Sequence, residues 1–320
     1  MDNETTGLAA YDDEIDLREL FSVLWEGKLT IALVTALSAV ISVSVALDLP
    51  NKYTSEALLA PRAEGGVGGG LGQLASQYGG LASLAGINIG GLGEGGKTAI
   101  AIEMLKSREF FGEYLYDRVL IDLMAAEGWD PASKKSIVNT SIYDSASQTW
   151  VRDVGPAFQV KPSVQEAHKA FVGSFLSVSE DKQTGFVTLA VTHFSPSVAR
   201  DWVLLIVNGV NNAVRARDVE EAENSIAFLN EQRQKTSLVS LTEVFAELIE
   251  QQTKTVMLAA ASEEYVFQII DPPVAPELKS EPRRALIYIL GVLLGGMLAV
   301  VYVLIRHYAK SDGRKSSASG

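Results

Sequence analysis

ALIYILGVLLGGMLAVVYVLI, residues 285–305, is a run of 21 residues without a charged side chain. A helix needs about 20 apolar residues to cross the hydrocarbon core of a bilayer. Arg284 and Arg306 bracket the run. Tyr288 and Tyr302 lie near its two ends, where aromatic residues of membrane–water interfaces are typically found. The run therefore predicts a transmembrane helix over residues 285–305.

A second apolar run lies near the N-terminus. LTIALVTALSAVISVSVAL, residues 29–47, also has no charged residue and predicts a transmembrane helix over residues 29–49. The alternative is a cleaved signal peptide, because Ser44 and Ala46 resemble a small-x-small cleavage site. The 28 residues before the run carry eight acidic and two basic side chains. A signal peptide begins with a short basic segment, so this composition favours an uncleaved anchor.

Two spans put both termini on the same side of a membrane. The flanks toward the termini carry six basic residues and the flanks toward the centre carry five. Since basic loops stay in the cytoplasm, we expect residues 1–28 and 306–320 to be cytoplasmic and residues 50–284 to form a periplasmic domain. The 15 residues after Ile305 are expected to leave no room for a further domain.

Composition excludes several classes of function. The 320-residue chain has a formal net charge of −12, which argues against nucleic acid as a partner, because phosphate binding needs a basic surface. It has no cysteine, which excludes disulfides, thiolate metal sites and cysteine nucleophiles. The three histidines, His168, His193 and His307, show no metal-ligand spacing and are interpreted as packing or surface residues. We expect no catalytic residue, metal or cofactor.

The region between the spans combines strand and helix patterns. Runs rich in β-branched and aromatic residues predict strands at residues 53–60, 175–181, 186–193 and 265–270. Apolar residues at helical spacing predict a helix over residues 98–126. A further helix is expected from Ser163, a plausible N-cap, to about Phe175.

Residues 197–262 contain no proline and only one glycine, Gly209, and they alternate charged and apolar residues at helical spacing. One helix of this length would measure on the order of 100 Å and would have to protrude or to pack against copies of itself. The alternative is two or three shorter helices folded as a hairpin. Apolar residues such as Leu229 and Phe245 need partners in either case, which indicates oligomerisation.

Residues 65–96 form a Gly-rich segment with 14 glycines among 32 residues. Apolar residues recur between the glycines, and Leu81, Leu84 and Ile87 are the candidates for close packing against backbone or a neighbouring subunit. The alternative is a mobile loop.

The end of this segment, GLGEGGKT at residues 91–98, matches the P-loop pattern G-x-x-x-x-G-K-[ST]. A P-loop domain builds a parallel sheet from alternating strands and helices. Here the one candidate for the second acidic motif, Asp271, leads directly into prolines and a membrane span. We interpret the match as chance in a glycine-rich run, with Lys97 at the start of a helix, and keep an ATPase or kinase as the less favoured hypothesis.

Two further features are candidates for structural roles. Prolines stiffen the segment between the last strand and the second span, because each fixes φ and lacks a donor; they are Pro272, Pro273, Pro276 and Pro282. This predicts a semi-rigid strut, with a solvated linker as the alternative. Gly291 and Gly295 form a small-xxx-small pattern that allows close helix packing against a sister subunit or a polymerase.

Seven segments in order resemble the bacterial chain-length determinant family, the polysaccharide co-polymerases of the Wzz type. They are DDEIDLRELFSVLWEGK (12–28), YTSEALLAP (53–61), GGLASLAGINIGG (79–91), LKSREFF (105–111), EGWDP (127–131), TGFVTLAVTHFSP (184–196) and EYVFQIIDPPVAPELKSEPRRA (264–285).

The resemblance implies an α+β fold, in which a membrane-proximal base domain with a mixed β-sheet carries a long protruding α-helix and is anchored by two transmembrane helices. It implies a homo-oligomeric ring, an octamer in related proteins, in the lipid of the bacterial inner membrane, without catalytic activity. Such a ring would act with a separate O-antigen polymerase on polyprenyl-linked polysaccharide and would set the modal chain length of lipopolysaccharide O-antigen or a related polymer. The alternative is an inner-membrane component of a polysaccharide export system.

Overall fold

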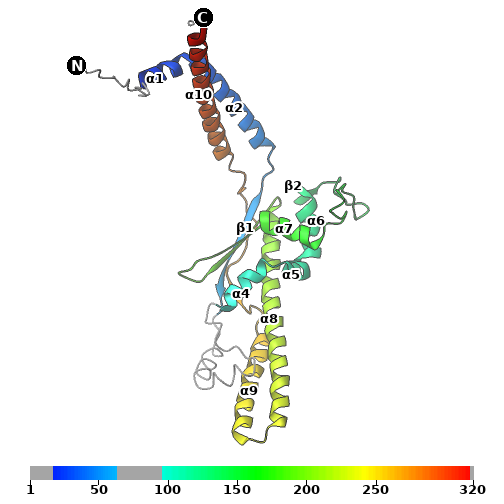
Figure 1. Cartoon of the computed structure of the whole chain (residues 1–320). Coiled ribbons are helices and arrows are strands. Elements are labelled where there is room, and N and C mark those ends of the chain that lie inside the picture. The colour runs from blue at the N-terminus through cyan, green and yellow to red at the C-terminus, as the bar shows by residue number, and fades with distance from the viewer. Residues whose placement is uncertain (1–16, 63–95, 318–320) are drawn as a thin grey trace, which may run out of the picture. The chain divides into compact units, whose positions relative to one another are not determined.

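The computed structural model describes residues 17–62 and 96–317, which form two compact units. The first unit consists of residues 1–50 and 281–320, and the second of residues 51–280 (Figure 1). Most of the Gly-rich segment, including Leu81, Leu84 and Ile87, lies outside the described residues.

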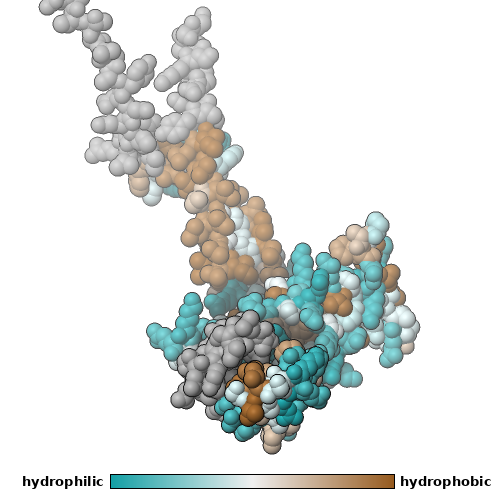
Figure 2. Space-filling model, turned by 60° about the horizontal axis from the view of Figure 1, so that its bottom comes forward, coloured by the Kyte–Doolittle hydropathy of each residue, from teal (hydrophilic) through white to brown (hydrophobic). Residues whose placement is uncertain are grey.

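The first unit is made of helices. α1 (Leu17–Glu26) is followed after one residue by α2 (Lys28–Asp48), and α10 (Arg284–Ser317) packs along α2. α2 and the part of α10 from Arg284 to His307 are long and apolar enough to cross a membrane. The face of these helices that is visible in Figure 2 is mostly hydrophobic. Both helices lie where the sequence predicted spans.

The second unit is built on one four-stranded sheet with the order β6-β7-β1-β8. Its strands are β1 (Tyr53–Pro61), β6 (Leu176–Glu180), β7 (Val187–His193) and β8 (Phe267–Asp271). All four strands were predicted. Every pairing is antiparallel, so the expectation of a mixed sheet was wrong. β6 and β7 form a hairpin and run in opposite directions, whereas β7 and β8 flank β1 and run the same way, so β1 is antiparallel to both of its neighbours.

One face of the sheet is buried by α8 (Pro196–Lys235). Along β7 every second side chain is buried, including Val187, Leu189 and Val191. The first half of α8 places Trp202 and Ile206 in the same apolar core. Period-two burial on the strand and helical-period burial on α8 together explain why these residues fold as a sheet covered by a helix.

The helix expected over residues 98–126 is interrupted. The structure has α4 (Gly96–Leu105), α5 (Arg108–Phe110), a π-helical turn η1 (Phe111–Leu115) and α6 (Tyr116–Ala125). The break falls at Ser107, whose hydroxyl accepts a hydrogen bond from Phe110 N at 3.2 Å and so starts a new helix.

The remaining elements of the second unit are short. Two small hairpins, β2 (Ala126–Asp130) with β3 (Lys135–Val138) and β4 (Tyr143–Asp144) with β5 (Thr149–Trp150), precede α7 (Val164–Ser174). Ser163 caps α7 as predicted, because its hydroxyl accepts a hydrogen bond from Glu166 N.

The long helical region is a hairpin rather than one helix. α8 ends at Lys235, and α9 (Val239–Ala261) runs back along it (Figure 1). The prediction of a single helix over residues 197–262 was therefore wrong, and the alternative of shorter helices folded as a hairpin is confirmed. Residues 236–238 leave the helical conformation, and Thr236 has φ −100° and ψ 136°. Threonine and serine at 236 and 237 favour such a break, since their side chains compete with helical hydrogen bonds.

Candidate functional site

The distal part of the α8–α9 hairpin, residues 219–256, buries few side chains between its two helices. Within it only Ala222 and Leu229 are fully buried. Phe245 and Leu248 on α9 are half-buried, and Phe228 on α8 is exposed. Helices in proteins gain most of their stability from packing an apolar face, so a pair that buries so little leaves apolar surface available for a partner.

The tip of the hairpin is also apolar. Leu238 and Val239, at the turn between α8 and α9, are 61% and 83% exposed. Figure 2, which looks toward this end of the molecule, shows an apolar spot surrounded by hydrophilic atoms. These two side chains lie outside the core and offer apolar surface for contact.

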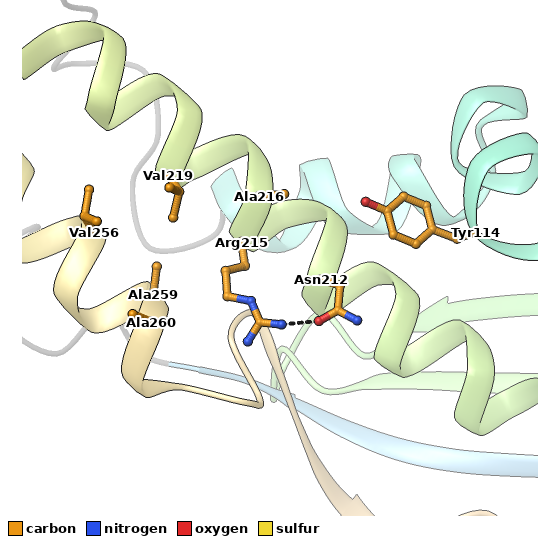
Figure 3. Close-up of a pocket in the computed structure, with 8 residues that line it drawn as sticks. All are labelled: Tyr114, Asn212, Arg215, Ala216, Val219, Val256, Ala259 and Ala260. Atoms are coloured by element: carbon orange, nitrogen blue, oxygen red, sulfur yellow. Dashed lines mark hydrogen bonds between the residues drawn. The ribbon is translucent and has the colours of Figure 1, made fainter. Parts of the chain in front are cut away.

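A shallow hollow lies at the root of the hairpin (Figure 3). It is lined mainly by small and apolar side chains: Tyr114, Asn212, Arg215, Ala216, Val219, Val256, Ala259 and Ala260. Arg215 donates to the Ser262 carbonyl at 2.8 Å and to the Asn212 side chain, so its guanidinium ties α8 to the end of α9.

The side chains that line this hollow offer apolar contact surface and hydrogen bonds from Arg215 and Asn212. Across residues 17–62 and 96–317, no group of three or more His, Cys, Asp or Glu side chains could hold a metal ion. The hairpin and its root thus present contact surface, and we treat them as the candidate functional site of the second unit.

Lys97, the lysine of the P-loop match, lies at the start of α4 and is engaged with protein groups. Its ammonium is 3.0 Å from Asp218 Oδ2 on α8, and Tyr265 Oη donates to the same oxygen at 2.8 Å. Thr98, the last residue of the match, is buried within α4. The Lys97–Asp218 ion pair joins α4 to α8, and the interpretation of Lys97 as the start of a helix agrees with its position.

Replacing Lys97 by methionine is expected to lower the free energy of unfolding by no more than about 1 kcal/mol, because the ion pair is half-exposed. The double variant with Asp218→Asn should show that the two losses are not additive. Thermal unfolding of the full chain, with and without ATP, measures both points. A nucleotide-dependent stabilisation that disappears with Lys97→Met would contradict this assignment.

The Pro-rich segment of the second unit runs beside β1. Ser55 Oγ donates to the Val274 carbonyl at 2.8 Å, and Ser280 N donates to the Lys52 carbonyl at 2.9 Å. Pro273 is buried, whereas Pro272 is exposed and Pro276 is half-buried. Prolines cannot donate to a ladder, so the segment follows β1 through isolated hydrogen bonds instead of extending β8. Pro282 belongs to the first unit.

Gly291 and Gly295 lie on α10 where it meets α2 of the same chain. A methyl group placed on Gly291 would overlap the side chain of Ser42, and one on Gly295 would overlap Ser38. The two glycines therefore oppose a second pair of small residues with the same four-residue spacing. The sequence had suggested a sister subunit or a polymerase as the partner of this pattern, and within the structure the partner is α2.

His193 is a packing residue, as interpreted. It is fully buried next to Trp202, with ring centroids 4.9 Å apart. Ser195 N donates to Nδ1 at 3.0 Å, so the neutral ring carries its proton on Nε2, which donates to the Asp122 carbonyl at 3.1 Å. Burial lowers the pKa of His193, because the charged form would lose its water.

This burial predicts a loss of stability in mild acid. Below its ordinary pKa of about 6.5, His193 takes up a proton in the unfolded chain before it does so in the folded chain. The free energy of unfolding should therefore fall as the pH drops below about 6.5 and be fully retained above it. Thermal unfolding from pH 7.5 to 5.5 tests this, and His193→Gln should flatten the dependence. The matched variant His168→Gln, at a half-buried position, should keep the pH dependence of stability. If His193→Gln keeps it as well, His193 is not its cause.

Two family models match the chain. Residues 13–118 match the chain length determinant protein model (Wzz), and residues 230–308 match the model described as a G-rich domain on putative tyrosine kinase. The first match runs from the N-terminal region to α6, and the second from the end of α8 into α10. No curated protein sequence matches.

Among the solved structures that match the chain are two of low identity and low TM-score. A full-length bacterial polysaccharide co-polymerase is 15% identical, with a TM-score of 0.38, over 93% of this chain and 99% of that chain. A fragment of WzzB, a polysaccharide co-polymerase from Salmonella Typhimurium, is 14% identical, with a TM-score of 0.32, over 72% of this chain and 100% of that chain.

Proposed function

We propose that this chain, as a member of the Wzz chain-length determinant family, regulates polysaccharide length without catalysing a reaction, because residues 13–118 match the family's model. This match is the observation that carries the proposal. The open apolar surface of the α8–α9 hairpin agrees with a protein that works through contacts. Its substrate would be O-antigen or a related surface polysaccharide on a polyprenyl carrier, extended by a separate membrane polymerase.

The proposed setting is the bacterial inner membrane. α2 and α10 would cross it, both termini would be cytoplasmic, and residues 51–280 would lie in the periplasm. The length and composition of the two helices support this arrangement. The slight excess of basic residues on the terminal flanks favours the same orientation.

The working form would be a homo-oligomeric ring, with an octamer as the expected size. Neighbouring hairpins would cover one another's half-buried apolar residues, such as Phe245 and Leu248. Such a ring would organise several polymerases or follow the growing chain along its surface. In both versions the hairpins are a scaffold, so their length should matter for the product.

Deletion of the gene and gel analysis of the surface polysaccharide tests the function. We expect the modal length to be lost while polymer is still made. Failure of the polymer to reach the surface would instead favour a component of an export system, and an unchanged length distribution would refute both.

The scaffold version has a sharper test. Excision of residues 226–248 with a short Gly-Ser turn in their place removes residues 226–235 of α8 and 239–248 of α9, equal lengths of both helices. We expect a changed or lost modal length with the sheet still folded, as judged by thermal unfolding. Lys182→Ser, in the exposed turn between β6 and β7 and outside the hairpin, is the control that should keep the normal modal length. A normal modal length in the excised variant would count against the scaffold.

A further inference from the structure

The helix that precedes the first span has an unused aromatic face. Phe21 and Trp25 of α1 are 65% and 61% exposed and lie one helical turn apart, so they share a face. Their rings are stacked, with centroids 6.0 Å apart. On the opposite side, Val23 is buried and α1 contacts α10. The fold therefore fixes the Val23 side of α1 and leaves the aromatic side open.

This face continues the lipid-facing surface of α2. Leu29 and Leu33 are exposed at the same four-residue spacing as Phe21 and Trp25. Only Gly27 separates α1 from α2, and the chain bends there (Figure 1). If α2 enters the bilayer at Lys28, the end of α1 must lie at the boundary between water and lipid.

The polar groups of α1 suit this boundary. The Lys28 ammonium lies 4.5 Å from the centroid of the Trp25 ring, so the cation and the indole occupy the same level. Lysine and tryptophan are the residues that interfaces favour, because each combines an apolar body with a polar end. Ser22 and Glu26 are exposed beside the aromatic pair and give the helix a polar flank.

We propose that α1 is an interfacial helix that lies on the phospholipid surface with Phe21 and Trp25 inserted among the headgroups and upper acyl chains. The inference rests on the proposed function only in that α2 and α10 are taken to cross a bilayer. The first 28 residues carry eight acidic and two basic side chains, so aromatic insertion rather than attraction to anionic lipid holds the helix. The helix then fixes the depth at which the α2–α10 pair sits.

The absence of cysteine from the chain allows a direct test. Single cysteines replace Phe21, Trp25, Ser22 or Glu26 in the full chain, are labelled with a polarity-sensitive fluorophore and are placed in phosphatidylcholine nanodiscs. Quenching is compared among aqueous iodide, a nitroxide near the lipid headgroup and a nitroxide at the end of the acyl chain. Lys182→Cys, in an exposed turn, reports full access from water. Leu37→Cys, in the middle of α2, reports the span itself.

We expect labels at Phe21→Cys and Trp25→Cys to be quenched best by the headgroup nitroxide, since interfacial helices sit about 5–10 Å into the boundary. Labels at Ser22→Cys and Glu26→Cys should keep iodide access. Iodide access at all four positions would overturn the proposal, because α1 would then be free in water. Protection from every quencher would overturn it as well, because protein would cover the face. If Leu37→Cys escapes the acyl-chain nitroxide, the span assignment has failed, and this outcome is separate from the other two.

Discussion

Replacing Asn211 by leucine is expected to lower the free energy of unfolding by about 3 kcal/mol or more, because three buried backbone groups lose their partner at once. Asn211 lies on α8 and is buried. Its Oδ1 accepts hydrogen bonds from Val266 N at 2.8 Å and Phe267 N at 2.9 Å, and its Nδ2 donates to the Phe267 carbonyl at 3.0 Å. Each orphaned group costs about 1–3 kcal/mol, so the loss should exceed that of a surface substitution several-fold.

The neighbouring residue supplies the control. Asn212 is exposed and its side chain accepts a hydrogen bond from Arg215, so Asn212→Leu makes the same chemical change outside the core. It should cost less than about 1 kcal/mol. Thermal and denaturant unfolding of the full chain in nanodiscs compares the two variants. A cost for Asn211→Leu within that of Asn212→Leu would show that the edge of β8 does not depend on this side chain.

Asn211→Asp separates the acceptor from the donor. The carboxyl keeps an acceptor for the two N–H groups but turns an oxygen toward the Phe267 carbonyl. A buried carboxyl resists ionisation, so this variant should be more stable in mild acid than at neutral pH. The opposite trend would mean that water or a cation reaches the site.

Asn211 also shows what the sequence could not predict. It stands in VNGVNNAV, where three asparagines lie at neighbouring positions of one helix, and nothing local distinguishes the buried one. Its role depends on residues 266 and 267 lying beside it, and the sequence alone does not show where the α8–α9 hairpin turns and returns the chain to this point. The four strands were predictable, because alternation along each strand is a local property. The antiparallel order of the whole sheet was not local and was missed.

The turn between α8 and α9 and the break between α4 and α5 were also missed in the sequence, for a related reason. Both occur at serine or threonine without proline or glycine, at Thr236 and Ser107. Arg233 and Lys235 in the last turn of α8 could have indicated a helix C-terminus, since cations there are stabilised by the negative end of the helix dipole. Composition was sufficient to predict two long apolar helices. How α10 packs on α2 depends on Ser38 and Ser42 lying opposite Gly295 and Gly291, which composition does not show.

The close packing of α10 on α2 leads to the second prediction with a large expected effect on stability. Gly295→Ala is expected to lower the free energy of unfolding by about 1–3 kcal/mol, because its methyl group would overlap the Ser38 side chain. Gly296→Ala, one residue on, places its methyl group 3.6 Å from Thr35 Oγ1, an ordinary contact. It should be neutral or slightly stabilising, since alanine is the better helix former. The same substitution should thus destabilise the protein at Gly295 and not at Gly296, and unfolding of the full chain in lipid can measure this difference.

Ser38→Gly completes the argument, because it removes the atoms that Gly295→Ala would meet. The Ser38 hydroxyl donates to the Val34 carbonyl of its own helix, so its removal breaks no bond to α10. The double variant should recover most of the stability lost in Gly295→Ala. If the glycines instead packed against another subunit, Ser38→Gly would not rescue the variant, and the oligomer measured by mass would change with Gly295→Ala alone. Rescue with an unchanged oligomer therefore assigns the small-residue seam to the α2–α10 pair within one chain.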